Sequence, residues 1–203
     1  IRNQTMTEAT SASQIVGMPY GVTSQISTTQ APTSSFFGAS VLKPGYTEIL
    51  MEYSEVLFLL SEANGWSQSY YEQGVRASME KWNIDSAKIN AFVAALPPAN
   101  KQNVLTQKYV SLFMQPFEAW AEYRRTGYPN TLLLPGQSAA LNVATASGQT
   151  TYTFTSLIAD LTDLPTRIYY PTTVQTLNTD NYKAASTAIG GDKMNTKLIW
   201  DKN

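Results

Sequence analysis

The sequence contains no cysteine and no histidine among its 203 residues. Structural zinc sites built from these ligands are therefore excluded, as are disulfides within the chain. A cysteine nucleophile, a Ser-His-Asp triad and an imidazole proton shuttle are excluded as well. Carboxylates, lysine, tyrosine or an oxygen-ligated metal remain as groups that could support catalysis. We expect a protein that is not an enzyme and that needs no cofactor.

Charged side chains are scarce, at 14% of the residues compared with roughly 25% in an average globular protein. The formal net charge of -1 argues against nucleic acid as a partner, because such a partner requires a basic surface. Serine, threonine, asparagine, glutamine and 12 tyrosines replace the charged residues. A neutral polar surface of this kind suits neutral polar ligands, sugars among them. The longest fully apolar run, residues 56–60, is far too short to cross a bilayer.

The chain begins with Ile1 and shows no signal peptide, so we expect it to be cut or processed from a longer protein. Its length is sufficient for one domain with a substantial core. Within that domain we expect three parts, distinguished by their content of Gly, Pro, Ser and Thr and by hydrophobic periodicity. These are a loop-rich segment (1–45) that packs on the helices, a set of helical hairpins (46–129), and a part with loops, a short hairpin and a C-terminal helix (130–203).

The central part follows the helical period of apolar residues. Its first helix is expected to begin at Thr47 and to end at Gly65, with its middle almost entirely buried. A second helix should follow at once and end near Trp82. The remaining helices are expected over 85–96, 100–114 and 117–127. Two antiparallel hairpins result, each of about the size of a tetratricopeptide unit.

The last part has weaker signals. Residues 132–155 contain glycines and short alternating segments, which indicate a loop or a short β-hairpin. Residues 164–171 should be extended, because prolines near both ends discourage helix formation. A short helix is predicted over 180–188, capped by Thr179. The fold is therefore expected to be mainly α-helical with little β-structure.

The densest feature is the segment 117–129, FEAWAEYRRTGYP. Phe117, Trp120 and Arg124 share one helical face, and Gly127 offers the left-handed residue that ends many helices. Phe117 and Trp120 are expected to lie in the core.

The arginines of this segment, Arg124 and Arg125, should pair with carboxylates. We predict that Glu55 or Glu62 of the first hairpin pairs with Arg124, Arg125 or Arg76, because a charge beside a buried apolar run requires a partner. Together, Glu55, Glu62, Trp120, Arg124 and Arg125 should form a structural scaffold rather than a ligand site.

Several segments in this order resemble the SusD/RagB family. They are EVLFLLSEA at 55–63, QKY at 107–109, FEAWAEYRRTGYP at 117–129, PTRIYYP at 165–171 followed by Asn178 and Asn181-Tyr182, and GDKMNTKLIWD at 191–201. The last segment departs from the family pattern at Ile199, where tryptophan is common. The combination is specific for the family, although no single motif is.

The resemblance implies a largely helical SusD-like fold with tetratricopeptide-like hairpins and long irregular loops. Members of the family are lipid-anchored proteins on the outer membrane, at the cell surface of Bacteroidetes-type bacteria. They bind glycans, or in some members peptides, without cleaving them, and act as lids on a SusC-like TonB-dependent transporter. This chain would be the C-terminal part, with the lipidated cysteine and much of the binding surface in sequence that precedes it.

Sugar binding requires exposed aromatic rings with amides and hydroxyls nearby. The candidate ligand-binding residues are Tyr20, Phe36, Phe37, Tyr152 and Phe154, with Asn3, Gln4 and Gln25 as polar neighbours in sequence. The alternative is that these rings only anchor long loops to the helices.

Two other functions remain open. One is a helical-repeat module that binds a protein partner on its concave face. The other is a carboxylate glycoside hydrolase, for which Glu118 with Glu122, or Glu55 with Glu62, would be the acids. Two acids on one helix do not face each other across a substrate, so the spacing gives this reading little support.

Overall fold

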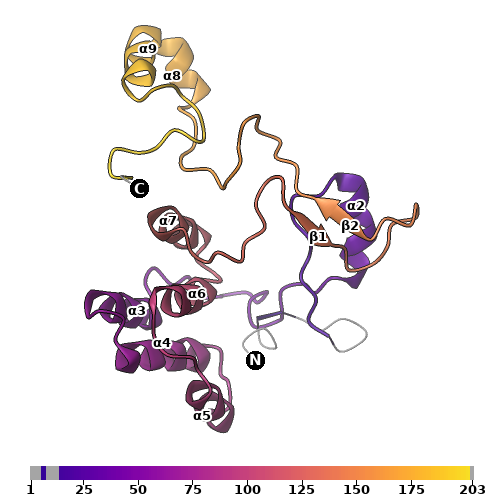
Figure 1. The fold of residues 1–203 in the computed structure, drawn as a ribbon, viewed down its shortest axis with the longest axis vertical. Helices are drawn as coiled ribbons and strands as arrows, with labels where there is room; N and C mark the ends of the chain where they lie inside the picture. The colour runs from indigo at the N-terminus through magenta and orange to yellow at the C-terminus, as the bar shows by residue number, and fades with distance from the viewer. Residues whose placement is uncertain (1–5, 8–13, 202–203) are drawn as a thin grey trace. The chain divides into compact units, whose positions relative to one another are not determined.

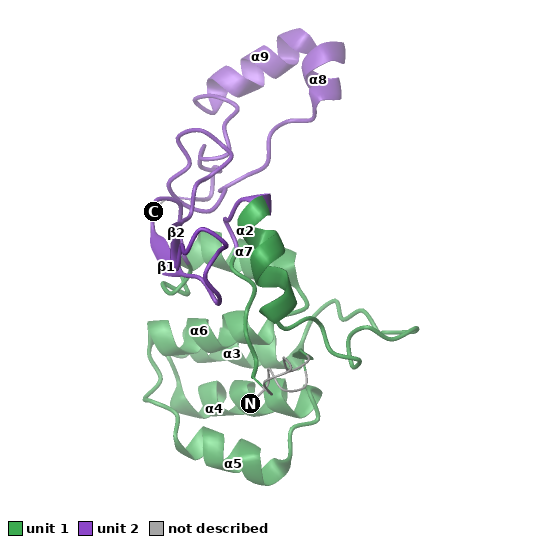
Figure 2. Ribbon diagram, turned by 90° about the vertical axis from the view of Figure 1, so that its right-hand side faces the viewer, with its two compact units in different colours: residues 1–19, 25–132 green, residues 20–24, 133–203 purple. Residues whose placement is uncertain are grey.

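The computed structural model describes residues 6–7 and 14–201, which form two compact units. Unit 1 comprises residues 1–19 and 25–132, and unit 2 comprises residues 20–24 and 133–203 (Figure 2). The described part is mainly helical, with one small two-stranded sheet, as the sequence predicts.

Unit 1 is built on the helices α3 (Tyr53–Ala63), α4 (Gln68–Lys81), α5 (Ser86–Ala94), α6 (Lys101–Ser111) and α7 (Pro116–Thr126). All five were expected from the sequence. Helix α4 packs against α3, α5 and α6, and α3 also packs against α6 (Figures 1 and 2). The turn between α3 and α4 is short, which makes them an antiparallel hairpin.

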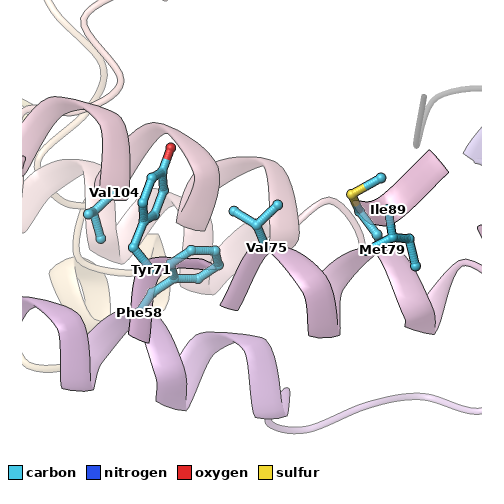
Figure 3. Close-up of a cluster of buried hydrophobic side chains, with 6 residues drawn as sticks. All are labelled: Phe58, Tyr71, Val75, Met79, Ile89 and Val104. Carbon is cyan, nitrogen blue, oxygen red and sulfur yellow. The ribbon is translucent and has the colours of Figure 1, made fainter. Parts of the chain in front are cut away.

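The core of unit 1 forms where these four helices meet. Phe58 of α3 and Tyr71 of α4 place their rings side by side, with a centroid distance of 6.5 Å, and Val104 of α6 lies next to Tyr71 (Figure 3). Val75, Met79 and Ile89 continue the buried cluster toward α5 (Figure 3). Gly74 allows the close contact of α3 and α4, because a Cβ atom there would lie 2.8 Å from the Phe58 ring.

The predicted start of the first helix, at Thr47, is wrong. Helix α3 begins at Tyr53, and Glu52 before it has extended backbone angles. The side chain of Glu52 is buried, accepts a hydrogen bond from the Ser54 hydroxyl and pairs with Lys81 of α4. This ion pair holds the chain outside the helix until residue 53.

Two burial predictions for the helices are also wrong. Leu59 and Leu60 of α3 are each 37% exposed, because α3 packs against α4 and α6 and leaves its other side open. Phe117 is 79% exposed. The buried face of α7 carries Ala119, Glu122 and Tyr123 instead, and the ion pair of Glu122 with the buried Lys108 orients the helix that way.

One further helix, α2 (Ser24–Gln30), precedes this set and is followed by a 3₁₀ turn, Ala31–Thr33. The sequence was expected to be irregular here, since SQISTTQ has no strong helical pattern. Gln30 at its end is fully buried, so tertiary packing stabilises a segment that has little intrinsic preference for helix.

Unit 2 contains an antiparallel hairpin of β1 (Ser138–Ala140) and β2 (Thr151–Thr153), in which Ala139 lies opposite Tyr152. The sequence predicted this hairpin. Helices α8 (Thr172–Leu177) and α9 (Thr179–Ala188) pack against each other near the end of the chain. Helix α9 was predicted, whereas α8, which begins directly after Pro171, was not. Residues 164–171 contain no helix or strand, in line with the extended segment that was expected.

Candidate functional site

The side chain of Tyr20 is fixed in unit 2 by residues that lie far from it in the sequence. Its hydroxyl donates a hydrogen bond of 2.8 Å to the carbonyl oxygen of Leu133. Its ring packs edge-to-face on Phe154, with ring centroids 5.7 Å apart and an interplanar angle of 78°. The residue nevertheless remains 46% exposed. An exposed ring held by a neighbouring ring and by a hydrogen bond of its hydroxyl is a rigid surface on which the apolar face of a sugar could stack.

Tyr152 also contacts Tyr20 and fixes its backbone. It lies on β2, and because side chains alternate along a strand, Tyr152 and Phe154 project to the same side of the hairpin. Tyr152 is buried, and its hydroxyl donates a 3.0 Å hydrogen bond to the carbonyl oxygen of Tyr20. Burial raises the pKa of the Tyr152 phenol, with a smaller contribution from Tyr20. A buried ring has no free face, so Tyr152 positions Tyr20.

We call Tyr20, Tyr152 and Phe154 the Tyr20 cluster. Two glycines shape it. The amide of Gly136 donates to the carbonyl of Phe154 at 2.8 Å, which fixes the chain beside that ring. Gly21 has a φ of 72°, and a Cβ atom there would lie 2.1 Å from the Phe154 ring. Sequence analysis missed this role of Gly21. A glycine directly after a candidate aromatic residue was the available signal, but the partner ring, Phe154, could not be inferred from it.

The other two candidate rings belong to unit 1 and are not part of this cluster. Phe37 packs edge-to-face on Phe113 at a centroid distance of 5.8 Å and forms an isolated bridge with Thr7. Phe36 is the more exposed of the two. Of the polar neighbours, Gln25 is exposed on α2, whereas Asn3 and Gln4 lie outside the described residues.

The carboxylates that the sequence singled out form an ion-pair network with cations of α6 and α7. The guanidinium of Arg125 binds both carboxylate oxygens of Glu62, at 2.8 and 2.6 Å, and also contacts Glu122 at 2.8 Å. Lys108, which is only 2% exposed, lies 3.0 Å from Glu122 and 3.9 Å from Glu55. The predicted pairing of Glu62 with an arginine across the hairpins is confirmed.

The pKa values of the two α3 carboxylates move in opposite directions. The hydrogen bonds from Arg125 lower the pKa of Glu62. Burial raises the pKa of Glu55, although Lys108 partly opposes this. We did not predict from the sequence that Lys108 is a buried cation that pairs with these carboxylates. The available signal was a lysine four residues after Val104 on an apolar helix face.

The other two arginines named in the prediction contact an aromatic ring and an amide. The guanidinium of Arg124 lies 3.9 Å from the ring centroid of Trp120, a cation–π contact one helical turn apart. Arg76 donates to the amide oxygen of Asn90.

The two C-terminal motifs contact each other in unit 2. Arg167 pairs with Asp192 at 2.9 Å and stacks on Tyr170, while the Thr166 hydroxyl donates to the carbonyl oxygens of Met194 and Thr196. These motifs therefore build structure in unit 2, in which Tyr169 and Trp200 are exposed aromatic residues besides Tyr20. Among the described residues, no group of three or more carboxylates converges as a metal site. No helix in that part of the chain is long and apolar enough to span a membrane.

Comparison with known proteins supports the resemblance noted in the sequence. The SusD-like family model, described as starch-binding and associating with the outer membrane, matches residues 2–153. No curated protein matches the chain in sequence.

Solved structures share the fold. A SusD-like protein of Bacteroidetes AC2a is 29% identical, with a TM-score of 0.67 over 83% of this chain and 33% of its own. A chitin-binding protein is 29% identical, with a TM-score of 0.63 over 85% of this chain and 38% of its own. A SusD homologue of Bacteroides thetaiotaomicron, 24% identical, has a TM-score of 0.64 over 94% of this chain and 45% of its own. The chain thus spans less than half the length of each of these relatives.

Proposed function

Because the chain belongs to the SusD-like family, we propose that it binds glycans at the cell surface without cleaving them, as part of a nutrient-uptake system. In this proposal the protein passes an oligosaccharide or polysaccharide segment to a SusC-like TonB-dependent transporter in the outer membrane. One relative with the same fold is described as chitin-binding, which favours a glycan over a peptide as the ligand.

The observation that carries the proposal is the geometry of Tyr20. Its ring is exposed, yet the ring packs on Phe154, the hydroxyl is hydrogen-bonded to Leu133 and the carbonyl to Tyr152. A ring that is already immobile loses little conformational entropy when a sugar stacks on it. Phe36 and Phe37 are exposed as well, so they stay candidates for a second contact on unit 1.

The carboxylates give no support to hydrolysis. Glu55 and Glu122 are held by Lys108, and Glu62 is held by Arg125. A glycosidase requires two acids on opposite sides of the scissile bond, one of them able to give up a proton to the leaving group. Carboxylates that neutralise buried cations are poorly suited to either task.

Affinity electrophoresis of the full chain on a panel of polysaccharides tests the proposal. We expect retardation on at least one glycan, with no release of reducing ends and no change in the length of the glycan. Release of reducing sugar would support the hydrolase instead. Absence of retardation on every glycan would overturn the proposal.

A second candidate function, a protein-interaction module, is favoured by the apolar surface at the start of α3. Leu50, Met51 and Tyr53 are exposed, Leu50 to 90%. Met51 and Tyr53, with Ile49 and Ala77, line a pocket of about 340 Å³ that also contains the Glu52–Lys81 ion pair. Contiguous exposed apolar residues often mark protein contacts. If glycan binding fails while Leu50→Ser abolishes capture of an outer-membrane transporter, this function would replace the first.

A further inference from the structure

We propose that the Tyr20 cluster selects uncharged glycans and rejects those that carry carboxylate or sulfate groups. The inference rests on the proposed function, and it adds the chemical class of the ligand. The inference is based on two observations: the charged residues are distributed unevenly along the sequence, and the contacts within the cluster are all made by uncharged groups.

Charged residues are absent from two long stretches of the sequence, 9–42 and 126–159. All 14 basic and all 15 acidic side chains lie elsewhere. The parts of unit 2 that build the Tyr20 cluster, residues 20–24 and the hairpin region 133–159, fall entirely within these stretches. The absence of charge is therefore concentrated where the candidate ligand-binding rings are.

The groups that contact one another in the Tyr20 cluster also carry no charge. Tyr20 donates to a backbone carbonyl, accepts from the phenol of Tyr152 and packs on the hydrocarbon ring of Phe154. On the hairpin, the Ser138 and Thr153 hydroxyls share a 2.8 Å hydrogen bond. The buried guanidinium in unit 2, that of Arg167, is engaged by Asp192 and Tyr170. Among the described residues 20–24 and 133–159, which build the cluster and its hairpin, a carboxylate or sulfate on a ligand would find hydroxyls and amides but no cation.

This environment penalises an anion in two ways. An anion that leaves water must be compensated by a positive charge or by several strong donors, and the cluster supplies no positive charge. The faces of the Tyr20 and Phe154 rings are negative and repel anions. A neutral pyranose presents C–H groups to such a face, and its hydroxyls can bond to uncharged donors and acceptors, so it pays neither penalty.

The test uses pairs of glycans with the same backbone and different charge. These are soluble starch with carboxymethyl starch, hydroxyethyl cellulose with carboxymethyl cellulose, and glycol chitin with carboxymethyl chitin. Heparin and polygalacturonate serve as strongly acidic probes. Dissociation constants are measured by calorimetry with the full chain, in about 50 mM and about 500 mM NaCl, which change the Debye length severalfold.

We expect the neutral member of at least one pair to bind about tenfold or more tightly than its anionic member. Its dissociation constant should change less than about twofold between the two salt concentrations, since no ion pairs form. Tyr20→Ala should weaken this binding by about tenfold or more, whereas Tyr169→Ala, which removes another exposed tyrosine of unit 2, should leave it unchanged.

The outcomes separate the two proposals. Tighter binding of the acidic members, weakened by salt, would overturn the selection for neutral glycans and leave the binding function intact. Neutral binding of unchanged affinity in Tyr20→Ala would remove the selection from this cluster. Failure of every neutral and charged glycan to bind would overturn both. A gain-of-charge variant, Thr155→Lys beside Phe154, should raise the affinity for the anionic members if the absence of a cation causes their rejection.

Discussion

The hydroxyl of Tyr20 donates a 2.8 Å hydrogen bond to the carbonyl oxygen of Leu133, 113 residues later in the chain. The carbonyl of the same tyrosine accepts a hydrogen bond from Tyr152, 132 residues away. Tyr20 belongs to a short N-terminal segment, residues 20–24, that is thereby joined to residues 133–203 in one unit. These two hydrogen bonds fix the orientation of the exposed Tyr20 ring, and a ring of fixed orientation suits the stacking of a sugar.

Tyr20→Ala is expected to weaken glycan binding by about tenfold or more, because removal of a central aromatic contact commonly costs about 2 kcal/mol. Tyr20→Phe keeps the ring and loses only the hydrogen bond to Leu133, so its effect should be smaller, about two- to tenfold. The measurement is retardation in affinity electrophoresis followed by calorimetry. Equal effects of the two variants would show that the ring does not stack on the ligand.

Gly21→Ala is expected to disable the site without removing any ring. The new Cβ atom would lie 2.1 Å from Phe154, and the left-handed backbone at φ 72° adds a cost of about 1–2 kcal/mol. Two matched variants separate these effects. Gly136→Ala has the left-handed backbone but open space, and Gly17→Ala has open space without a left-handed backbone.

The melting temperature and the glycan affinity are measured for each of the three glycine variants. We expect the largest loss in Gly21→Ala, a moderate loss of stability in Gly136→Ala and almost none in Gly17→Ala. If Gly136→Ala lowers affinity as much as Gly21→Ala does, contact with Phe154 is not what matters at position 21.

The sequence predicted the helices of unit 1 well because their apolar residues follow the helical period and their ends carry Gly, Pro or Asp. It failed where a single long-range contact decides the outcome. Residues 47–52 contain a plausible cap at Thr47, but burial of Glu52 against Lys81 keeps them out of the helix. Phe117 follows an apolar pattern, yet the burial of Glu122 beside Lys108 turns α7 the other way.

The candidate site was predictable in kind but not in arrangement. Loop-borne aromatic residues could be listed from the sequence, and Tyr20, Tyr152 and Phe154 do lie together. Which rings meet depends on how residues 20–24 join the hairpin, and periodicity carries no information about such pairing. The assignment of ligand contacts to Tyr20, Phe36, Phe37 and Phe154 stays a prediction.

Lys108→Met is expected to lower the free energy of unfolding by about 3–5 kcal/mol, because it removes the buried cation that lies between Glu55 and Glu122 and leaves Glu122 with Arg125 alone. Lys88→Met, at an exposed position of α5, should change it by less than about 0.5 kcal/mol. Urea unfolding provides the measurement. The double variant Lys108→Met/Glu122→Gln should recover part of the loss, and a double variant no more stable than Lys108→Met would contradict the ion-pair explanation.

Glu62→Gln tests the pH dependence of the Arg125 pair. The pKa of Glu62 in the folded protein lies below its ordinary value of 4.5, owing to the hydrogen bonds from Arg125. Its contribution to stability is therefore complete at neutral pH and is lost as the pH falls below 4.5 through the folded pKa. Wild-type protein should exceed Glu62→Gln in melting temperature at pH 7, and the difference should shrink in acid. Glu80→Gln, at an exposed position of α4, is the control.

Glu55→Gln should show the opposite dependence, because burial raises the pKa of Glu55 in the folded protein. The ionised carboxylate then costs stability at neutral pH, and this cost disappears as the pH falls through the raised pKa toward 4.5. Relative to wild type, Glu55→Gln should therefore be most favourable at pH 7 and lose that advantage in acid. Melting curves recorded across this range for both variants would settle the matter, since the two differences from wild type must change with opposite sign. If both change in the same direction, burial of Glu55 does not outweigh its attraction to Lys108.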